Sequence, residues 1–547
     1  MASDDASLAN HYVSYLAAAF AKHADAAVFR PYVDRTDFWP TVTYRELNAQ
    51  LAAAKEHWKV ALAPLGLTHG DVVGCWFTGR RLADFVNSTA LSALGFVPQF
   101  FGGYFPSADS VLLLLERGGG KALVVDPSLA APFAEHPSTV PRFSPLAPAE
   151  LDTLAAARPL DEWAFGADRA VRLDDVAILF HSSGTTAGLP KIIPNTFRML
   201  RSVLEHKFSK EQLPSRPGVQ VCYNTIGSLA NIGSYQCLIG AINLGGCVAQ
   251  SSSMLIPPAE LLGLVRECKI TILVLYAPFL SALLRPAMAD PELEGALLTL
   301  HQITHTGVAL NKDDEDWAYA HGLNINTSYG TTETGPLMWS RLGSAPADRA
   351  MRPIRGTRPV FLPQTAEASS VDAKGVELFE CAIPADAEDC PPGDFCGADG
   401  FYHTGDLFER RFDGWVYRGR AGDWIRLQRG FCDTKSVEDF VRSACKDVIH
   451  DVVVLGTARP LAFWAVEVPR EAPPLTEEEK GALKKEVLAR TSEFNKTLFQ
   501  HERVLEPKQV FVVEKGVLPR TKEKGNIRRA VTEELFQAEL DALAPKN

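Results

Sequence analysis

The sequence lacks several features that define other classes of protein. Its ten cysteines are scattered without a CxxC pair, which argues against a zinc ribbon or a redox dithiol. No stretch approaches the ~18 uninterrupted apolar residues that a membrane span requires. The N-terminal segment begins acidic and lacks the basic start and small-residue cleavage site of a secretory signal. We therefore expect a cytoplasmic protein with no membrane partner, whose cysteines are reduced and mostly buried.

A surplus of positive charge is also missing. The net charge is −11 at pH 7, whereas a nucleic-acid groove needs clustered Lys and Arg. Apolar residues make up 46% of the chain and charged residues 22%, which is ordinary for a globular protein. The chain has 547 residues, more than one core usually supports. We therefore expect two or more folding units, and a small-molecule enzyme without a nucleic-acid partner.

Helical and strand patterns alternate along most of the chain. Residues 42–66 place apolar side chains at helical spacing, and short apolar runs follow at 71–77 and 121–126. The same alternation recurs at 259–280. It predicts an α/β fold with largely parallel sheets. Turn-rich short strands at 341–400 predict a β-rich subdomain within the same large unit.

The pattern changes after the segment GRAGDW at 419–424. The elements predicted beyond it are a helix at 435–446, strands at 449–456 and 463–469, a long charged helix at 476–498 and a strand at 509–514. We therefore divide the chain into a large N-terminal domain, residues 1–421, and a small α+β C-terminal domain, residues 422–547.

A phosphate-binding loop is suggested by HSSGTTAGLPK at 181–191. It is not a Walker A loop, because Leu-Pro separates Lys191 from the second glycine, and it contains no G-x-G-x-x-G fingerprint. The loop lies between apolar runs at 174–180 and 191–195, so we expect a strand-to-strand turn. Its amides and hydroxyls could close on a polyphosphate, with Lys191 as the cation. A plain exposed Ser/Thr/Gly loop is the alternative.

This loop resembles the signature loop S-S-G-T-T-x-G-x-P-K of the adenylate-forming superfamily. That superfamily includes acyl-CoA synthetases, adenylation domains of nonribosomal peptide synthetases, carboxylic acid reductases and beetle luciferases. The resemblance covers about residues 40 to 530, because the other motifs of the family follow in the expected order. It implies that the phosphates of ATP contact Ser182, Ser183, Gly184, Thr185, Thr186 and Lys191.

A second segment, SYGTTET at 328–334, resembles the YGxTE motif of the same superfamily. The resemblance implies a nucleotide site that includes Ser328, with Tyr329 packed on adenine. It also implies that Thr331 and Thr332 meet the phosphate and that Glu333 helps to hold Mg²⁺, which neutralises charge on the α-phosphoryl group. For this segment alone, a helix N-cap with an acidic first turn is the alternative.

Two further segments resemble the ribose and hinge motifs. In YHTGDL at 402–407, Asp406 matches the aspartate that accepts hydrogen bonds from the ribose, where each carboxylate oxygen can take one O–H. In WVYRGRAGDWIRLQRG at 415–430, Arg420 would reach the ribose or a phosphate. The usual hinge aspartate falls on Gly422, with Asp423 one place later, so either residue could be the pivot. Each segment alone would also fit a β-turn with a charged tip.

The last motif, GVLPRTKEKGNIRRAV at 516–531, resembles the segment that places a lysine over the reacting carboxylate. Here the lysine precedes the glycine, so we assign Lys524, with Lys522 as the alternative. A positioned cation stabilises the transition state because the α-phosphate and the incoming carboxylate are both negative. The resemblance implies that the small domain is mobile and carries this lysine. A solvated basic tail is the alternative.

The acid substrate is expected between the phosphate loop and the YGxTE motif. Candidate polar contacts in this region are Asn224, Asn231, Tyr276, His305 and Gly307. Residues 222–246 contain no acidic side chain, whereas amino-acid-activating domains usually place an aspartate near Asn224 to pair with the substrate ammonium. Burying an ammonium without a counter-charge is costly. We therefore expect an acid without an α-amino group, such as an aryl or hydroxy acid.

The resemblance implies a second half-reaction in which a thiol takes the acyl group. The acceptor is the phosphopantetheine of a carrier domain, in cis or in trans, or else CoA. The motif details resemble adenylation domains of fungal adenylate-forming reductases most, and a freestanding acyl- or aryl-CoA ligase is the alternative. A luciferase-like oxygenase and an AMP-binding module without catalysis are alternatives from other classes.

Overall fold

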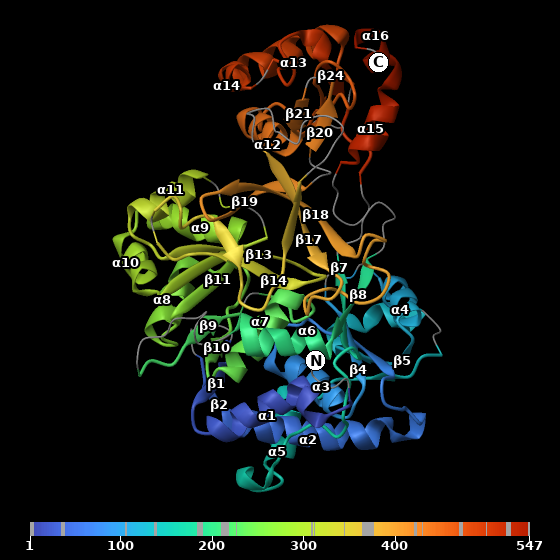
Figure 1. Cartoon of the computed structure of the whole chain (residues 1–547), viewed down its shortest axis with the longest axis vertical. Helices are drawn as coiled ribbons and strands as arrows, with labels where there is room; N and C mark the ends of the chain where they lie inside the picture. Colours follow the sequence, from blue (N-terminus) through green and yellow to red (C-terminus); the bar gives the residue numbers. More distant parts are fainter. Residues whose placement is uncertain are drawn as a thin grey trace.

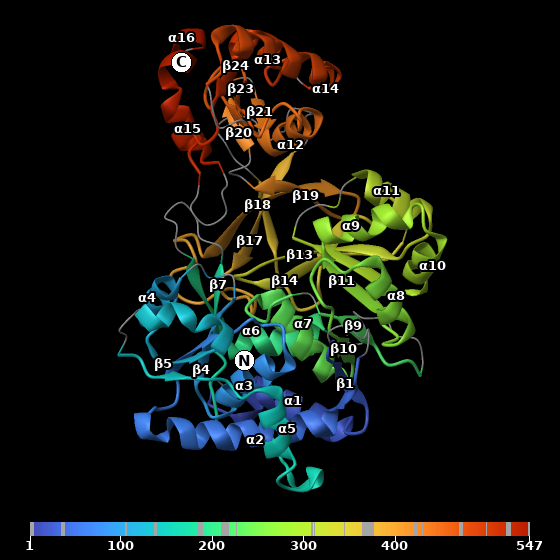
Figure 2. The same cartoon turned by 180° about the vertical axis from the view of Figure 1, so that it is seen from behind.

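The computed structural model describes most of the chain. The described residues are 5–33, 39–103, 105, 107–135, 139–182, 190–208, 218–225, 227–307, 310, 312–343, 345–363, 377–420, 424–428, 430–469, 474–498, 500–520 and 527–544. Figures 1 and 2 show a broad part built from the N-terminal elements and a separate, smaller part built from the elements that follow β19. The mixed α/β architecture confirms the predicted fold class.

One sheet of the large part has the strand order β6-β5-β3-β4-β7-β8. Its strands are β3 (Val72–Trp76), β4 (Val97–Phe101), β5 (Gly120–Val125), β6 (Arg142–Phe143), β7 (Val176–Ser182) and β8 (Lys191–Thr196). They pair in parallel except for β7 and β8, which pair in antiparallel register. Every residue of β3 and β4 is buried, as expected for parallel strands covered on both faces.

A longer sheet has the order β16-β17-β18-β19-β15-β14-β13-β12-β11-β9-β10-β1-β2. From β13 to β1 its neighbours are parallel, and from β14 to β16 they are antiparallel, which confirms the predicted β-rich region. The strands are β1 (Ala27–Arg30), β2 (Val42–Thr43), β9 (Cys222–Asn224), β10 (Cys247–Ala249), β11 (Ile272–Tyr276), β12 (Gln302–Thr306), β13 (Ile325–Thr331), β14 (Gly335–Ser340), β15 (Met351–Pro353), β16 (Val360–Pro363), β17 (Leu378–Pro384), β18 (Phe401–Arg411) and β19 (Gly414–Arg420).

Helices cover these sheets. They are α1 (Tyr12–Lys22), α2 (Tyr44–Leu62), α3 (Leu82–Ala93), α4 (Ala108–Arg117), α5 (Pro148–Ala155), α6 (Phe197–Ser202), the π-helical turn Val203–Lys207, α7 (Ile232–Asn243), α8 (Pro258–Arg266), α9 (Ala277–Ala287), α10 (Pro291–Thr299) and α11 (Lys312–Ala320). The predicted helix at 42–66 corresponds to α2, which begins with a capping box between Thr43 and Glu46.

The C-terminal part contains a two-stranded pair, β20 (Trp424–Leu427) and β21 (Gly430–Asp433), and a sheet of order β22-β23-β24. Its remaining elements are α12 (Thr434–Ala444), β22 (Asp451–Leu455), β23 (Phe463–Glu467), α13 (Glu477–Arg490), α14 (Ser492–Thr497), β24 (Val510–Val513), α15 (Arg529–Leu535) and α16 (Gln537–Leu543). The predicted domain boundary at residues 421 and 422 lies outside the described residues and stays a prediction.

One helix prediction was wrong. The single helix expected at 476–498 is two helices, because the backbone leaves the helical path at Thr491 (φ −103°, ψ 4°). The Thr491 hydroxyl donates to the carbonyl of Val487, 2.8 Å away. A threonine that bonds back to the preceding turn in this way often bends a helix.

No helix among the described residues has the length and apolar character to cross a membrane.

Two histidines of the large part are buried and hydrogen-bonded. His181 lies 2.8 Å from the Phe100 carbonyl through Nδ1 and 3.2 Å from Gln99 Nε2 through Nε2, and His11 contacts the Ser92 carbonyl at 3.2 Å. Each ring can satisfy its contacts as a neutral imidazole. Burial lowers the pKa of both His11 and His181 to about 4.

We predict that the large part loses stability as the pH falls from about 6.5 to about 4. In this window the unfolded histidines bind protons and the folded ones do not, so each costs about 2 kcal/mol by pH 5. The free energy of urea unfolding, followed by tryptophan fluorescence between pH 7.5 and 5, measures this loss. His181→Gln should be less stable at pH 7.5 but show a flatter pH dependence. An unchanged pH dependence in both His181→Gln and His11→Gln would contradict the prediction.

Candidate active site

The predicted phosphate loop lies in the sequence between two strands that pair with each other. Strands β7 and β8 pair in antiparallel register, with Ser182 opposite Lys191, which confirms the predicted strand-to-strand turn. Ser182 is half-buried at the end of β7, and Lys191 is exposed at the start of β8. The remaining predicted contacts, Ser183, Gly184, Thr185 and Thr186, lie outside the described residues, so their roles stay predictions.

Asp406 forms the best-defined junction of the candidate site. It lies on β18, it is 3% exposed, and it brings together three donors from β13 and β19. Tyr329 on β13 donates its hydroxyl to Oδ2 at 2.7 Å, and on β19 Arg420 Nε and the Tyr417 hydroxyl donate to Oδ1 at 3.0 Å and 3.4 Å. Burial raises the pKa of the Asp406 carboxyl above its usual value, and the Arg420 charge opposes this shift.

The SYGTTET segment is a strand followed by a tight turn, so the alternative of a helix N-cap was wrong. β13 ends at Thr331 and pairs with β14, and the turn between them contains Thr332 and Glu333, both half-buried. The Thr331 and Thr334 hydroxyls lie 3.1 Å apart across this turn. Ser328 accepts a hydrogen bond from the Trp339 indole at 3.0 Å.

Tyr402 connects this turn to the Asp406 junction. Burial raises the pKa of its phenol, and the negative charge of nearby Glu333 adds to the shift, while contact with Thr331 opposes it. The segments around Thr331–Glu333 and Tyr402–Asp406 therefore lie close together. Sequence reasoning missed Tyr402 and Tyr417 as site residues, although both lie within the segments that it singled out.

A buried ion pair contacts the turn between β13 and β14. Lys207 Nζ lies 2.5 Å from Asp389 Oδ1, and the two side chains are 1% and 0% exposed. The same ammonium donates to the Thr334 carbonyl at 3.0 Å, next to Glu333. Breaking such a pair by removing one partner is strongly destabilising, because it leaves a buried charge alone. No local sequence pattern predicted this role for Lys207 or Asp389, because the two residues pair only in the folded chain.

The predicted acid contacts gather at the carboxyl ends of neighbouring parallel strands. Asn224 ends β9, Tyr276 ends β11, and His305 lies one residue before the end of β12. Gly307 follows β12 with φ +90°, and a Cβ there would lie 2.9 Å from the Tyr276 ring, so glycine allows the ring to approach. Ligands bind at this edge of open α/β sheets.

Two of these side chains also hold the scaffold together. The Asn224 amide accepts from Val274 N at 2.7 Å and donates to the Val274 carbonyl at 2.9 Å and to the Thr225 carbonyl at 3.0 Å. His305 Nε2 lies 2.9 Å from the Thr327 hydroxyl on β13. Asn231 begins α7. Contact of any of them with the acid stays a prediction, as do the roles of Lys524, Lys522, Gly422 and Asp423, which lie outside the described residues.

Comparison with known families explains why these motifs meet. Residues 16–375 match the family model described as AMP-binding enzyme, and residues 432–546 match that of the AMP-binding enzyme C-terminal domain. The chain belongs to the AMP-binding enzyme family. It is therefore an adenylate-forming ligase, and the predicted superfamily is confirmed.

Relatives of the enzyme differ in length. The AMP-binding domain-containing enzyme iboA of Amanita muscaria (strain Koide BX008) is 28% identical over 489 residues, which cover 88% of this chain and 92% of the relative. The adenylate-forming reductase stbB of Stachybotrys bisbyi is 27% identical over 315 residues, 54% of this chain and 28% of the relative. The enzyme thus matches nearly the whole of iboA but about a quarter of the reductase.

Solved structures share the fold of the enzyme. The O-succinylbenzoate Coenzyme A synthetase (MenE) of Bacillus subtilis, in complex with AMP, superposes with a TM-score of 0.67. The match covers 94% of this chain and 97% of MenE at 17% sequence identity. At this identity the likeness shows the fold, including the separate C-terminal domain.

Proposed function

We propose that the enzyme converts a carboxylic acid without an α-amino group and ATP into acyl-AMP and pyrophosphate, and then transfers the acyl group to a thiol in the cytoplasm. The Asp406 junction carries this proposal. Its carboxylate is buried between donors from β13 and β19, and it shares the neighbour Tyr402 with the Glu333 turn, so ribose and phosphate groups of one nucleotide can reach the two motifs together.

In the proposed first step, a carboxylate oxygen of the acid attacks the α-phosphorus and pyrophosphate leaves with the electrons of the broken P–O bond. Asp406 orients the ribose, and Arg420 fixes Asp406. Thr331 and Thr332 donate to the phosphate, and Ser182 and Lys191 lie at the two ends of the loop assigned to pyrophosphate. Lys524 is assigned to the charge that develops between the carboxylate and the α-phosphate.

Mg²⁺ fits the donors that the site offers. Glu333 contributes one half-buried carboxylate beside Tyr402, and no group of three or more His, Cys, Asp or Glu side chains among the described residues could hold a metal ion by itself. This matches a Mg²⁺ site completed by phosphates and water, because Mg²⁺ commonly uses one or two carboxylates with substrate phosphates. Bound there, the ion would neutralise charge on the phosphates.

The thiol acceptor is proposed to be the phosphopantetheine of a carrier domain, as the likeness to the reductase suggests. CoA is the second candidate, and the match to iboA favours it. That match leaves little of iboA outside the aligned region, so iboA has little room for an attached carrier domain. A freestanding enzyme would use CoA or a carrier supplied in trans.

A pyrophosphate-release screen tests the proposal. We expect turnover with aryl and hydroxy acids, and little or none with the matched α-amino acids, because residues 222–246 offer no carboxylate to an ammonium. EDTA should abolish the signal, and Glu333→Gln should raise the Mg²⁺ concentration needed for half-maximal rate. Trapping with hydroxylamine identifies the acyl product, and CoA and a pantetheinylated carrier can then be compared as acceptors. Best turnover with a standard amino acid would contradict the substrate assignment.

A further inference from the structure

A second feature lies beside the predicted acid site, at the carboxyl ends of β9 and β10. It is a cavity of about 30 Å³ between these strands, β1, α7 and the segment that leads into α3. Its apolar wall includes Phe29, Leu229, Leu238 and Val248. At about 10–15 Å³ for each water-sized group, the cavity holds about two such groups. This is room for a small terminal group and too little for an aromatic ring.

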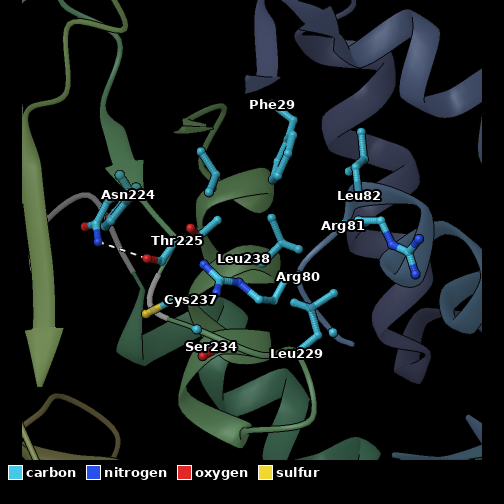
Figure 3. Close-up of a pocket in the computed structure, with 14 residues that line it drawn as sticks. Phe29, Arg80, Arg81, Leu82, Asn224, Thr225, Leu229, Ser234, Cys237 and Leu238 are labelled. Carbon is cyan, nitrogen blue, oxygen red and sulfur yellow. Dashed lines mark hydrogen bonds between the residues drawn. The ribbon is translucent and has the colours of Figure 1, made fainter. Parts of the chain in front are cut away.

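The cavity has one cation available to a ligand. Figure 3 shows Arg80 extending toward Thr225, whereas Arg81 turns away toward the opposite side. Arg81 is paired with Asp84 and Asp126. In the described part of the chain, Arg80 has no carboxylate partner, and its one hydrogen bond reaches the Ser251 carbonyl at 3.4 Å.

Two residues that line the cavity also carry buried hydroxyls that lack partners among the described residues. Ser234 is 5% exposed and Tyr223 is 3% exposed, and neither Ser234 Oγ nor the Tyr223 phenol oxygen has a hydrogen-bond partner there. A buried hydroxyl without a partner is costly, so such groups usually mark the place of a water or ligand. No acidic side chain lines the cavity. A guanidinium and two hydroxyls without acids form a donor set for an anion.

The position of the cavity connects it to the reaction. The cavity is lined by Asn224, the last residue of β9, and by Thr225, which follows it. Strand β9 neighbours β11, and β11 in turn neighbours β12 with His305. Two strand spacings, about 10 Å, separate β9 from β12. An elongated acid whose reacting carboxylate lies near β12 and β13 can therefore reach the cavity with its far end.

We infer that Arg80 binds a second carboxylate at the far end of the acid, so that the preferred substrates are dicarboxylic acids. This inference rests on the proposed adenylation reaction and narrows its substrate class. Arg80 contacts the substrate away from the reacting atoms, so it is a specificity residue. A guanidinium can donate one hydrogen bond to each oxygen of a carboxylate, and the Ser234 and Tyr223 hydroxyls complete the donor set.

The test compares straight-chain diacids, from malonate to suberate, with their monoamides in the pyrophosphate-release assay. The wild type should prefer a diacid over its own monoamide by about 10- to 100-fold in kcat/KM. Arg80→Met should raise the KM for the diacid by a similar factor, with kcat and the monoamide little affected. Arg80→Lys should keep part of the preference for the diacid, which shows that the loss in Arg80→Met does not come from misfolding. Arg81→Lys should keep all of the preference.

Two results would overturn the inference. One is a wild type that turns over monoamides or simple monoacids as well as the matched diacids. The other is a preference for diacids that survives in Arg80→Met. Turnover of aryl monoacids without any influence of Arg80 would leave the adenylation reaction standing and refute only the role of Arg80. Absence of pyrophosphate release with every acid would refute the adenylation reaction and this inference together.

Discussion

Asp406→Asn is expected to raise the KM for ATP by about 10- to 100-fold, because hydrogen bonds to a charged partner are worth about 1.5–3 kcal/mol. The Asp406 carboxylate offers about four lone-pair positions, and Tyr329, Tyr417 and Arg420 already donate to it. A ribose diol would use the remaining position and compete for another. An amide keeps one acceptor oxygen and turns an N–H₂ group toward Arg420, so the ribose loses its anchor and Arg420 loses its counter-charge.

The measurement is the KM for ATP at saturating acid, with Glu409→Gln as the matched control. Glu409 lies on the same strand, is 7% exposed and pairs with Arg411 and Arg418. The Glu409→Gln variant should lower the stability of the fold about as much as Asp406→Asn does, without changing the KM for ATP. Equal changes in the two variants would show that Asp406 acts through stability alone.

The pH dependence of ATP binding tests the role of Asp406 a second time. Burial raises the pKa of Asp406, so the carboxylate becomes protonated at a higher pH than an ordinary aspartate. ATP binding that needs the anion should therefore weaken as the pH falls through this raised pKa, and recover above it. Asp406→Asn should lack this component, and a profile as steep as that of the wild type would contradict the assignment.

Lys524→Ala is expected to lower kcat for adenylation by about 10²–10³-fold, the usual loss on removing one positioned donor from a developing negative charge. The acid and the α-phosphate repel each other most in the transition state, so the lysine acts on kcat while ATP binding stays close to normal. Nucleotide binding is measured separately by equilibrium titration with ATP.

Lys522→Ala is the matched control, because it removes the same charge two positions earlier. If Lys522 is the catalytic residue, the two variants exchange their behaviour, with Lys522→Ala nearly inactive and Lys524→Ala close to wild type. Two active variants would contradict the catalytic assignment of this motif. Two equally weak variants would point to general attraction of phosphates by a basic segment.

Local patterns predicted much of the fold because they depend on neighbours in the chain. The apolar runs around the phosphate loop predicted the hairpin of β7 and β8, and turn-rich segments predicted β15 to β17. The break at Thr491 was missed, because the apolar and charged pattern continues through it and only the hydroxyl contact with Val487 reveals the bend. Motif resemblance located Asp406 and Arg420, whose side chains form an ion pair.

Contacts between distant segments could not be predicted in the same way. Lys207 and Asp389 are ordinary charged residues in the sequence, and only the fold buries them against each other. Arg80 and Arg81 are neighbours of the same type, yet one is paired with aspartates and the other faces a cavity, because adjacent residues before a helix point in different directions. Asn224 was chosen as a substrate contact from its place in the motif, and its bonds to Val274 depend on the pairing of β9 with β11.

Isotope transfer tests the central claim most directly. An acid labelled with ¹⁸O in its carboxylate is incubated with the enzyme, ATP, Mg²⁺ and hydroxylamine, and the AMP is analysed by mass spectrometry. Attack of the carboxylate on the α-phosphorus puts one labelled oxygen between carbon and phosphorus, and cleavage of the acyl C–O bond then leaves that oxygen on AMP. We predict AMP with one ¹⁸O and an equal amount of pyrophosphate. Unlabelled AMP, or ADP and phosphate as the products, would contradict adenylation of the acid.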